Sequence, residues 1–184
     1  MTTNSKPQPS TRTPAAWWLA TCFGIGWMKP GPGTWASIAA LLLWLPVLWF
    51  PSQWLPSASQ HSALPAFFVT LVLALLSTLI GIPIASRVAR EAGLGDPQFV
   101  VLDEAAGTWT ALLAACWPLA GWPVSWRAAL AALVLFRLFD IWKPWPVSAL
   151  DRIHGGIGIM LDDIAAGLYS LVCVLILRYF SVLR

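Results

Sequence analysis

The stretch between Lys29 and Arg87 contains no Asp, Glu, Lys or Arg. It holds two apolar runs, at about residues 34–55 and 64–85, on either side of the polar, proline-containing segment around residues 56–65. Each run is close to the roughly 20 residues that cross a bilayer as a helix. Ionisable groups are costly inside a membrane, so their absence here has a physical reason. The pattern predicts two membrane-spanning helices.

The composition of the whole chain agrees with a membrane protein. Of its 184 residues, 58% are hydrophobic and 10% are charged, whereas a soluble domain carries about 25% charged residues. The mean hydropathy is +0.72. Thirteen tryptophans, many of them beside apolar runs, are typical of side chains at the membrane–water interface.

Three further apolar runs follow, at about residues 105–121, 126–142 and 164–177. Residues 17–28 are too short and too rich in tryptophan for a span, so we expect an interfacial or re-entrant helix there. The sequence therefore predicts an all-α, compact helical bundle, embedded in the membrane, with about five apolar helices and an N-terminal interfacial helix. Residues 1–14 are rich in Ser, Thr and Pro, which predicts a disordered tail before a single domain at 15–184.

The basic residues predict the orientation of the chain in the membrane. Placing the N-terminus in the cytoplasm puts most Lys and Arg residues on the cytoplasmic side, as the positive-inside rule requires. This placement uses no acidic residue, yet it brings every carboxylate to or near the same face: Glu91, Asp96, Asp103, Glu104, Asp140, Asp151, Asp162 and Asp163. We expect one shared site on that face.

Two acidic pairs, Asp103-Glu104 and Asp162-Asp163, each precede an apolar run. Acidic side chains at the start of a helix can cap its free N–H groups and complement its dipole. Carboxylate oxygens are also the ligands of Mg²⁺, which binds one or two of them together with substrate phosphate and water. Both roles are compatible with the sequence.

Arg137, Asp140 and Lys143 recur every three residues before Pro144, so they form one stripe on a helix. The stripe has two interpretations. It can be an ion-pair ladder that neutralises charge within the membrane. It can also be part of a phosphate and metal site, with Asp140 as a metal ligand and the two cations offsetting phosphate charge.

Two loop segments hold further candidates. Thr34 follows Pro32-Gly33, where its hydroxyl either caps the next helix or binds phosphate at the helix N-terminus. His154 precedes a pair of glycines, where it is either a structural residue or a general acid for a leaving alkoxide.

Small residues recur at four-residue spacing in the third and fifth runs, a pattern that favours close packing of membrane helices. The positions are Ala106, Thr110 and Ala114 in one run, and Ala166 and Ser170 in the other. We expect these two helices to pack together, which would bring the two acidic pairs close to each other.

Four segments together resemble one bacterial family, phosphatidylglycerophosphatase A. They are PGT (32–34), LDEAAGTW (102–109), FRLFDIWKPWP (136–146) and DRIHGGIGIMLDDIAAG (151–167). The family removes the terminal phosphate of phosphatidylglycerophosphate in a magnesium-dependent reaction. The resemblance implies an all-α fold, which in soluble relatives is a central helix wrapped by others. It also implies a site at the matching residues Thr34, Asp103, Glu104, Asp140, Lys143, His154, Asp162 and Asp163.

We therefore expect a Mg²⁺-dependent lipid phosphatase at the cytoplasmic face of the bacterial inner membrane. Its expected partners are the phospholipid substrate and the membrane, with no nucleic acid. The expected metal ligands are Asp103, Glu104, Asp140, Asp162 and Asp163. The expected phosphate-binding residues are Thr34, Arg137 and Lys143. The expected catalytic residues are Asp103, Asp140, Lys143, His154 and Asp163.

Two other functions remain open from the residues alone: a small membrane transporter, and a non-catalytic assembly protein whose acidic pairs only cap helices. A conduction path needs polar groups at several depths. Carboxylates gathered at one face therefore argue against the transporter.

Overall fold

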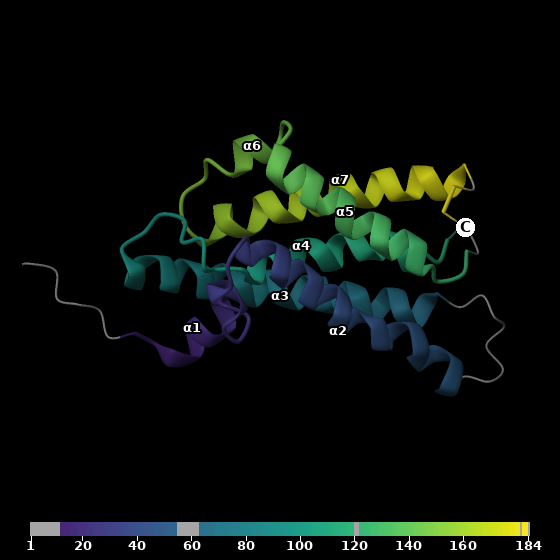
Figure 1. Cartoon of the computed structure of the whole chain (residues 1–184), viewed down its shortest axis with the longest axis horizontal. Coiled ribbons are helices and arrows are strands. Elements are labelled where there is room, and N and C mark those ends of the chain that lie inside the picture. Colours follow the sequence, from purple (N-terminus) through teal and green to yellow (C-terminus); the bar gives the residue numbers. More distant parts are fainter. Residues whose placement is uncertain (1–11, 55–62, 120–121, 181, 184) are drawn as a thin grey trace, which may run out of the picture.

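The computed structural model describes residues 12–54, 63–119, 122–180 and 182–183, which form helices and connecting segments without a strand in these ranges. The helices form one elongated bundle (Figure 1). The predicted all-α class is confirmed. In chain order the helices are α1 (Pro14–Ala20), η1 (Ile25–Trp27), α2 (Pro32–Trp54), α3 (Leu64–Ala92), α4 (Leu102–Leu112), η2 (Leu113–Cys116), α5 (Trp126–Trp142), α6 (Val147–Leu150) and α7 (Gly156–Tyr179).

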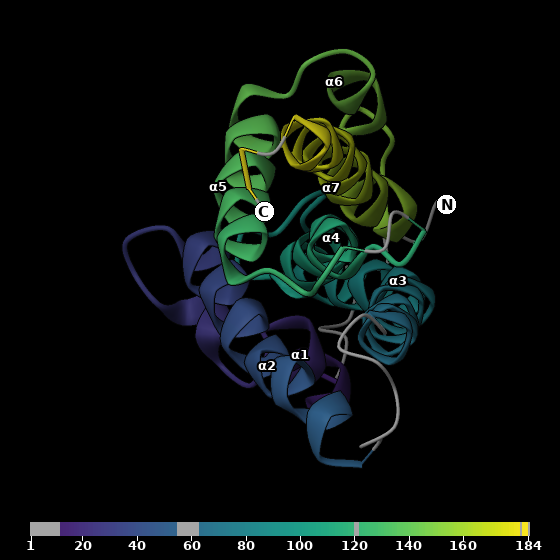
Figure 2. The same cartoon turned by 90° about the vertical axis from the view of Figure 1, so that its right-hand side faces the viewer.

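Helix α4 lies at the centre of the bundle. It contacts α2, α3, α5 and α7, and these helices surround it in the view along the long axis (Figure 2). Its residues Ala106, Ala111 and Leu112 are completely buried. A short apolar helix can hold this place because its neighbours supply apolar contacts on every side.

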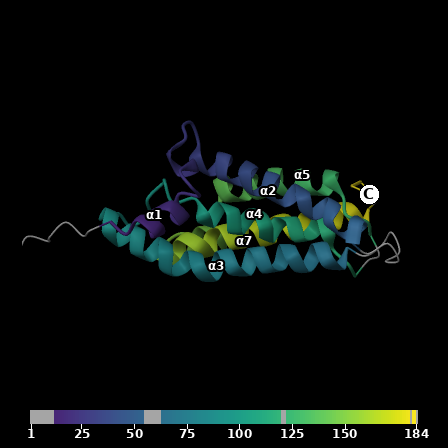
Figure 3. The same cartoon turned by 90° about the horizontal axis from the view of Figure 1, so that it is seen from below.

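The helices lie side by side along the long axis of the molecule (Figure 3). Helices α2, α4 and α7 begin at the end of the bundle where α1 and α6 lie, and α3 and α5 finish there (Figure 1). This arrangement brings all the acidic residues to the same end of the bundle, because each lies near one of these helix ends or in a loop that joins them. The bundle therefore has one acidic end, which we call the carboxylate end.

The contact between α4 and α7 depends on small residues. A Cβ on Gly107 would lie 2.7 Å from the Asp163 carbonyl oxygen, and one on Gly167 would lie 2.5 Å from the Gly107 carbonyl oxygen. The five small residues singled out in the sequence are all buried: Ala106, Thr110, Ala114, Ala166 and Ser170. The predicted close packing of these two helices is confirmed.

Helix α7 begins earlier than predicted. The sequence indicated a loop at His154 and the glycines after it, and an apolar run from about residue 164, whereas α7 starts at Gly156. The glycines that indicated a loop are instead contact points, because a Cβ on Gly156 would collide with the Ile82 carbonyl and one on Gly158 with the Ile153 carbonyl. Asp162 and Asp163 consequently lie inside the helix, and no acidic residue occupies its first turn. The interpretation that this pair caps α7 is therefore wrong.

The N-terminal region also differs from the prediction. Residues 17–28 form the end of α1 and the separate helix η1, because Cys22, Phe23 and Gly24 all have positive φ. Most of the predicted tail, residues 1–11, lies outside the described residues. Thr13 already donates hydrogen bonds to Glu91 through its backbone N–H (2.9 Å) and its hydroxyl (2.7 Å). Helix α1 thus begins one residue before the predicted domain boundary at residue 15.

Two of the described helices, α3 and α7, are long and apolar enough to cross a membrane. The apolar part of α2, Pro32–Val47, is shorter. The third predicted run is divided between α4 and η2, and the helical structure ends before Trp117. The helix lengths therefore do not confirm the predicted five apolar spans. Helix α3 exposes much of its apolar surface: Leu64, Phe68, Val69, Val72, Leu75, Leu76, Leu79 and Ile80.

Candidate active site

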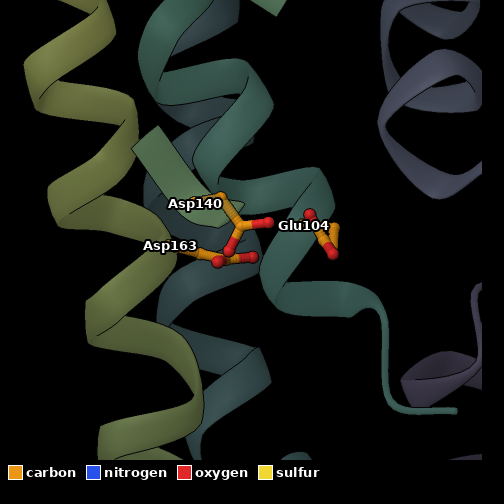
Figure 4. A group of neighbouring side chains, drawn as sticks. All are labelled: Glu104, Asp140 and Asp163. Carbon is orange, nitrogen blue, oxygen red and sulfur yellow. The ribbon is translucent and has the colours of Figure 1, made fainter. Parts of the chain in front are cut away.

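Three carboxylates from three helices meet at the carboxylate end. Glu104 lies in the first turn of α4, Asp140 near the end of α5 and Asp163 in the second turn of α7. One oxygen of each lies within 4.8 Å of the others, and Figure 4 shows Asp140 and Asp163 facing Glu104. Asp163 is only 4% exposed. We call Glu104, Asp140 and Asp163 the carboxylate trio.

Helix α2 closes one side of the trio. A Cβ on Gly33 would collide with the Glu104 carboxylate, so a larger residue there would require the Glu104 side chain to move away from α2. One turn later, the buried Ser37 hydroxyl lies 2.9 Å from the Gly33 carbonyl and 3.4 Å from Glu104 Oε2. Thr34, between them in the chain, is exposed.

Arg137 is the cation next to the trio. Its Nη1 forms ion pairs with Glu104 Oε2 and with Asp140 Oδ2, the latter at 3.0 Å. The ladder expected within α5 thus exists between Arg137 and Asp140, and it extends across to α4. Among the described residues, the buried Nε of Arg137 has no acceptor.

Lys143 does not continue that ladder. It ends α5 with a left-handed backbone (φ 47°), and its Nζ forms ion pairs with Asp151 and, at 2.8 Å, with Asp162 Oδ2. Partial burial lowers the pKa of Lys143, but these two partners outweigh burial and raise it above its usual value. Lys143 therefore joins the end of α5 to the loop after α6 and to α7.

The trio fits a hard divalent cation. Its donors are all carboxylate oxygens, the type that Mg²⁺ and Ca²⁺ prefer. Within the described part of the chain, Asp163 Oδ2 is buried without a hydrogen-bond donor, whereas buried polar atoms are normally paired. A cation at the trio would supply the missing partner. The residues placed to hold it are Glu104, Asp140 and Asp163.

The electrostatics of α4 agree with this fit. Burial, followed by the charge of Asp140, raises the pKa of Glu104 to about 7, although Arg137 opposes the shift. Burial and the neighbouring Glu104 also raise the pKa of Asp103 well above its usual range. The ion-free site thus disfavours a full set of negative charges, and a bound cation would reverse this.

The other two predicted metal ligands lie apart from the trio. Asp103 and Asp162 line a cavity of ≈ 400 Å³, which we call the acidic cavity. Asp162 Oδ1 is buried and, like Asp163 Oδ2, lacks a partner among the described residues. A hollow of ≈ 440 Å³ at α1 is lined by tryptophans and Arg12 and holds no carboxylate. The polar residues of the acidic cavity are Asp96, Asp103, Asp151, Arg152, His154 and Asp162.

The predicted site residues are thus distributed over two adjoining places. Glu104, Asp140 and Asp163 form the trio with Arg137 beside them, while Asp103, His154 and Asp162 line the acidic cavity. Lys143 is tied to the cavity through its ion pairs with Asp151 and Asp162. Thr34 stands exposed on α2.

Ser37 escaped the sequence prediction, whereas Asp151 was predicted only as one of the carboxylates at the shared face, without a role in the site. Ser37 lies four residues after Gly33, and this spacing places it on the helix face that Gly33 turns toward Glu104. Asp151 lies in the same short segment as His154, but its pairing with Lys143 depends on the fold of the loop. The spacing was a usable signal for Ser37, whereas nothing in the sequence indicated that Asp151 pairs with Lys143.

The chain matches the family model described as phosphatidylglycerophosphatase A over residues 18–178. It is 36% identical over 154 residues to the phosphatidylglycerophosphatase A of Escherichia coli K12, covering 83% of this chain and 77% of the relative. It is 32% identical over 163 residues to the protein of that name from Haemophilus influenzae, covering 88% of each.

A third relative, from Bacteroides thetaiotaomicron, is provisionally named a phosphatidylinositol-3-phosphatase. It is 33% identical over 164 residues, covering 88% of this chain and 92% of the relative. No solved structure gives a significant match. The family match extends over nearly all of the bundle, including every residue of the trio and of the acidic cavity. The chain belongs to the phosphatidylglycerophosphatase A family.

Proposed function

We propose that this chain hydrolyses the terminal phosphate monoester of phosphatidylglycerophosphate, releasing phosphatidylglycerol and inorganic phosphate. The names of two relatives support the substrate and the reaction. The observation that carries the proposal is the carboxylate trio, whose oxygens from three helices lie within 4.8 Å of one another. Sites that combine carboxylates, a cation and a phosphate are typical of phosphoryl-transfer enzymes.

Magnesium is the cation that we propose for the trio. Opposite ligands of one Mg²⁺ lie about 4 Å apart, twice the usual Mg–O distance. Oxygens up to 4.8 Å apart would therefore need only small side-chain movements to share an ion. An ion held by Glu104, Asp140 and Asp163 would supply Lewis-acid chemistry to the phosphate and would lower the pKa of a coordinated water.

Arg137 orients the phosphate in this proposal. It pairs with Glu104 and Asp140, and its Nε has no acceptor within the described structure. An Nε–H held beside the trio can donate to a phosphate oxygen, and a guanidinium suits phosphate because of its planar donors. The exposed Thr34 hydroxyl, one residue after the glycine that packs on Glu104, can donate to the same group from α2.

His154 supplies the proton for the leaving group. It lines the acidic cavity together with Asp103 and Asp162. Hydrolysis of a phosphate monoester produces an alkoxide on the glycerol, and imidazole is the common donor for such a proton near neutral pH. Lys143, which fixes the positions of Asp151 and Asp162, holds the wall of the cavity in which that glycerol would lie.

A membrane location agrees with the surface of the bundle. Helix α3 is 29 residues long, and only 22% of its most apolar window is buried. Exposed apolar side chains also lie on α5 and α7, including Val134, Ile141, Leu168 and Val172. Large exposed apolar surfaces are typical of membrane or protein interaction sites. We place the bundle in the bacterial inner membrane with its carboxylate end at the cytoplasmic face.

A phosphate-release assay tests the function. The purified protein in detergent micelles should release inorganic phosphate from phosphatidylglycerophosphate with Mg²⁺ and not with EDTA. Asp140→Asn should remove this activity without unfolding the protein, whereas Arg127→Gln, at the start of α5 away from the trio, should leave it unchanged. Folded wild-type protein that releases no phosphate would contradict the proposal.

The orientation has its own test. Single cysteines at positions 60 and 95 should react with an impermeant maleimide from the outside and from the cytoplasmic side, respectively. The protein background for this experiment lacks Cys22, Cys116 and Cys173, which are free thiols. Reversed labelling would refute the cytoplasmic placement of the carboxylate end.

A further inference from the structure

The acidic cavity adjoins the trio through two pairs of chain neighbours. Asp103 of the cavity precedes Glu104 of the trio on α4, and Asp162 precedes Asp163 on α7. A phosphate held at the trio therefore has the cavity beside it. The rest of the substrate, which is bonded to that phosphate, must extend either into the cavity or away from it.

The outer wall of the cavity is held rigidly. A Cβ on Gly158 would collide with the Ile153 carbonyl, so residues 151–155 pack directly on the first turns of α7. Lys143 fixes the start of the same segment through its ion pair with Asp151. The Ser86 hydroxyl accepts a hydrogen bond of 3.0 Å from Gly156 N at its end. A wall fixed at both ends can select a ligand by shape and charge.

The lining of the cavity fits a hydroxylated group with an anion at one side. Carboxylates accept hydrogen bonds from hydroxyls, and the buried Asp162 Oδ1 lacks a donor among the described residues. Lys143 offsets the charges of Asp151 and Asp162. Arg152 is the one Lys or Arg among the described lining residues. It is exposed, so it stands where a charged group can enter.

We propose that the acidic cavity binds the glycerol that bridges the two phosphates of the substrate, and that Arg152 pairs with the second, diester phosphate. This inference rests on the proposed function and adds a specificity determinant to it. The cavity would favour a lipid whose reacting phosphate is followed by a polyol and a second phosphate. Phosphatidate, whose single phosphate is attached directly to the lipid glycerol, offers Arg152 no second phosphate.

The experiment compares two lipids in the same detergent micelles, phosphatidylglycerophosphate and phosphatidate, with wild type, Arg152→Gln and Arg152→Lys. For Arg152→Gln we expect KM for phosphatidylglycerophosphate to rise about tenfold or more, the size expected for one charge-assisted pair, with kcat nearly unchanged. The KM for phosphatidate should stay the same. Arg152→Lys should restore part of the preference, because it keeps the charge without the bidentate geometry.

A matched control is Arg90→Gln. Arg90 is an exposed arginine in the last turn of α3 at the same end of the bundle, and it does not line the cavity. Its removal changes the net charge by the same amount. It should leave the KM values of both lipids unaltered.

The outcomes separate the two proposals. If wild type hydrolyses phosphatidylglycerophosphate but Arg152→Gln keeps its KM, the cavity assignment is overturned and the proposed function stands. If Arg152→Gln lowers kcat for both lipids equally, Arg152 has a structural role and the assignment is again overturned. If folded wild type releases no phosphate from either lipid, the proposed function itself fails, and the inference with it.

Discussion

Gly107 and Gly167 touch where α4 crosses α7: a Cβ on Gly167 would lie 2.5 Å from the Gly107 carbonyl oxygen. This backbone contact sets the distance between the two helices. It lies one turn after each acidic pair, so Asp103-Glu104 and Asp162-Asp163 are brought to the same place. The geometry of the site thus depends on two residues that have no side chain.

Gly167→Val should damage both stability and activity. The added methyl groups would force α4 and α7 apart, and overpacking of this kind costs about 1–3 kcal/mol. We expect a lower thermal unfolding temperature in detergent and a loss of phosphate release beyond the loss of folded protein. The control is Leu168→Ala, on the half-exposed neighbour, which should keep its activity. Normal activity in folded Gly167→Val would show that the helix spacing is unimportant.

Magnesium should stabilise the protein through the trio. At about 100 times its Kd, a ligand that binds only the folded state adds about 2.7 kcal/mol to the free energy of unfolding. Asp163→Asn should abolish this gain while leaving the ion-free protein as stable or more stable, because it removes one of three clustered charges. Thermal unfolding with Mg²⁺ and with EDTA measures both effects. Asp96→Asn, outside the trio, should keep the gain; an unchanged gain in Asp163→Asn would exclude Asp163 as a ligand.

The ion-free protein should lose stability as the pH rises from about 4.5 to about 7. Burial and Asp140 raise the pKa of Glu104 from 4.5 to about 7, so the folded state retains a proton that the unfolded state has released. The free energy of unfolding then falls with pH in this window, by about 1.4 kcal/mol at most per pH unit. Unfolding in EDTA at several pH values measures the slope. Glu104→Gln should reduce the slope of the free energy of unfolding against pH. An equal slope in that variant would show that another group causes the pH dependence.

Lys143 and Asp162 should be energetically coupled. Lys143→Met leaves the buried Asp162 carboxylate without its 2.8 Å partner, and Asp162→Asn removes the charge that Lys143 balances. Each single change should cost about 1–3 kcal/mol. The double variant should cost less than the sum, by about 1 kcal/mol or more. Additive costs in denaturant unfolding would show that the ion pair contributes nothing to stability.

Arg178 should matter for stability alone. This completely buried side chain lies in the last turn of α7 and donates to the carbonyls of Ala114 (2.7 Å), Ala115 (2.9 Å) and Pro123 (2.6 Å). Arg178→Met leaves three acceptors unpaired, at a cost of about 1–3 kcal/mol each. We expect a much lower unfolding temperature with unchanged kcat for the folded fraction. A changed kcat would indicate that this distant end affects the site.

Several elements of the fold could be predicted from the sequence. The charge-free run from residue 34 became α2, although Pro46 and Pro51 lie within it, and the run at 126–142 matched α5. Long apolar segments favour helices in an apolar surrounding. Gly156 and Gly158 misled the prediction, because glycine indicates a loop whenever its packing partner is unknown. Ile82 and Ile153 supply those partners from distant parts of the chain.

The sequence alone determined the helical class, the gathering of the carboxylates at one end and the residue types of the site. These follow from hydropathy and from the order of charges along the chain. Only the tertiary structure decided how five predicted ligands divide, with Glu104 and Asp163 in the trio and their neighbours Asp103 and Asp162 in the acidic cavity. Adjacent residues on a helix point about 100° apart, and which of them meets Asp140 depends on how α4, α5 and α7 pack.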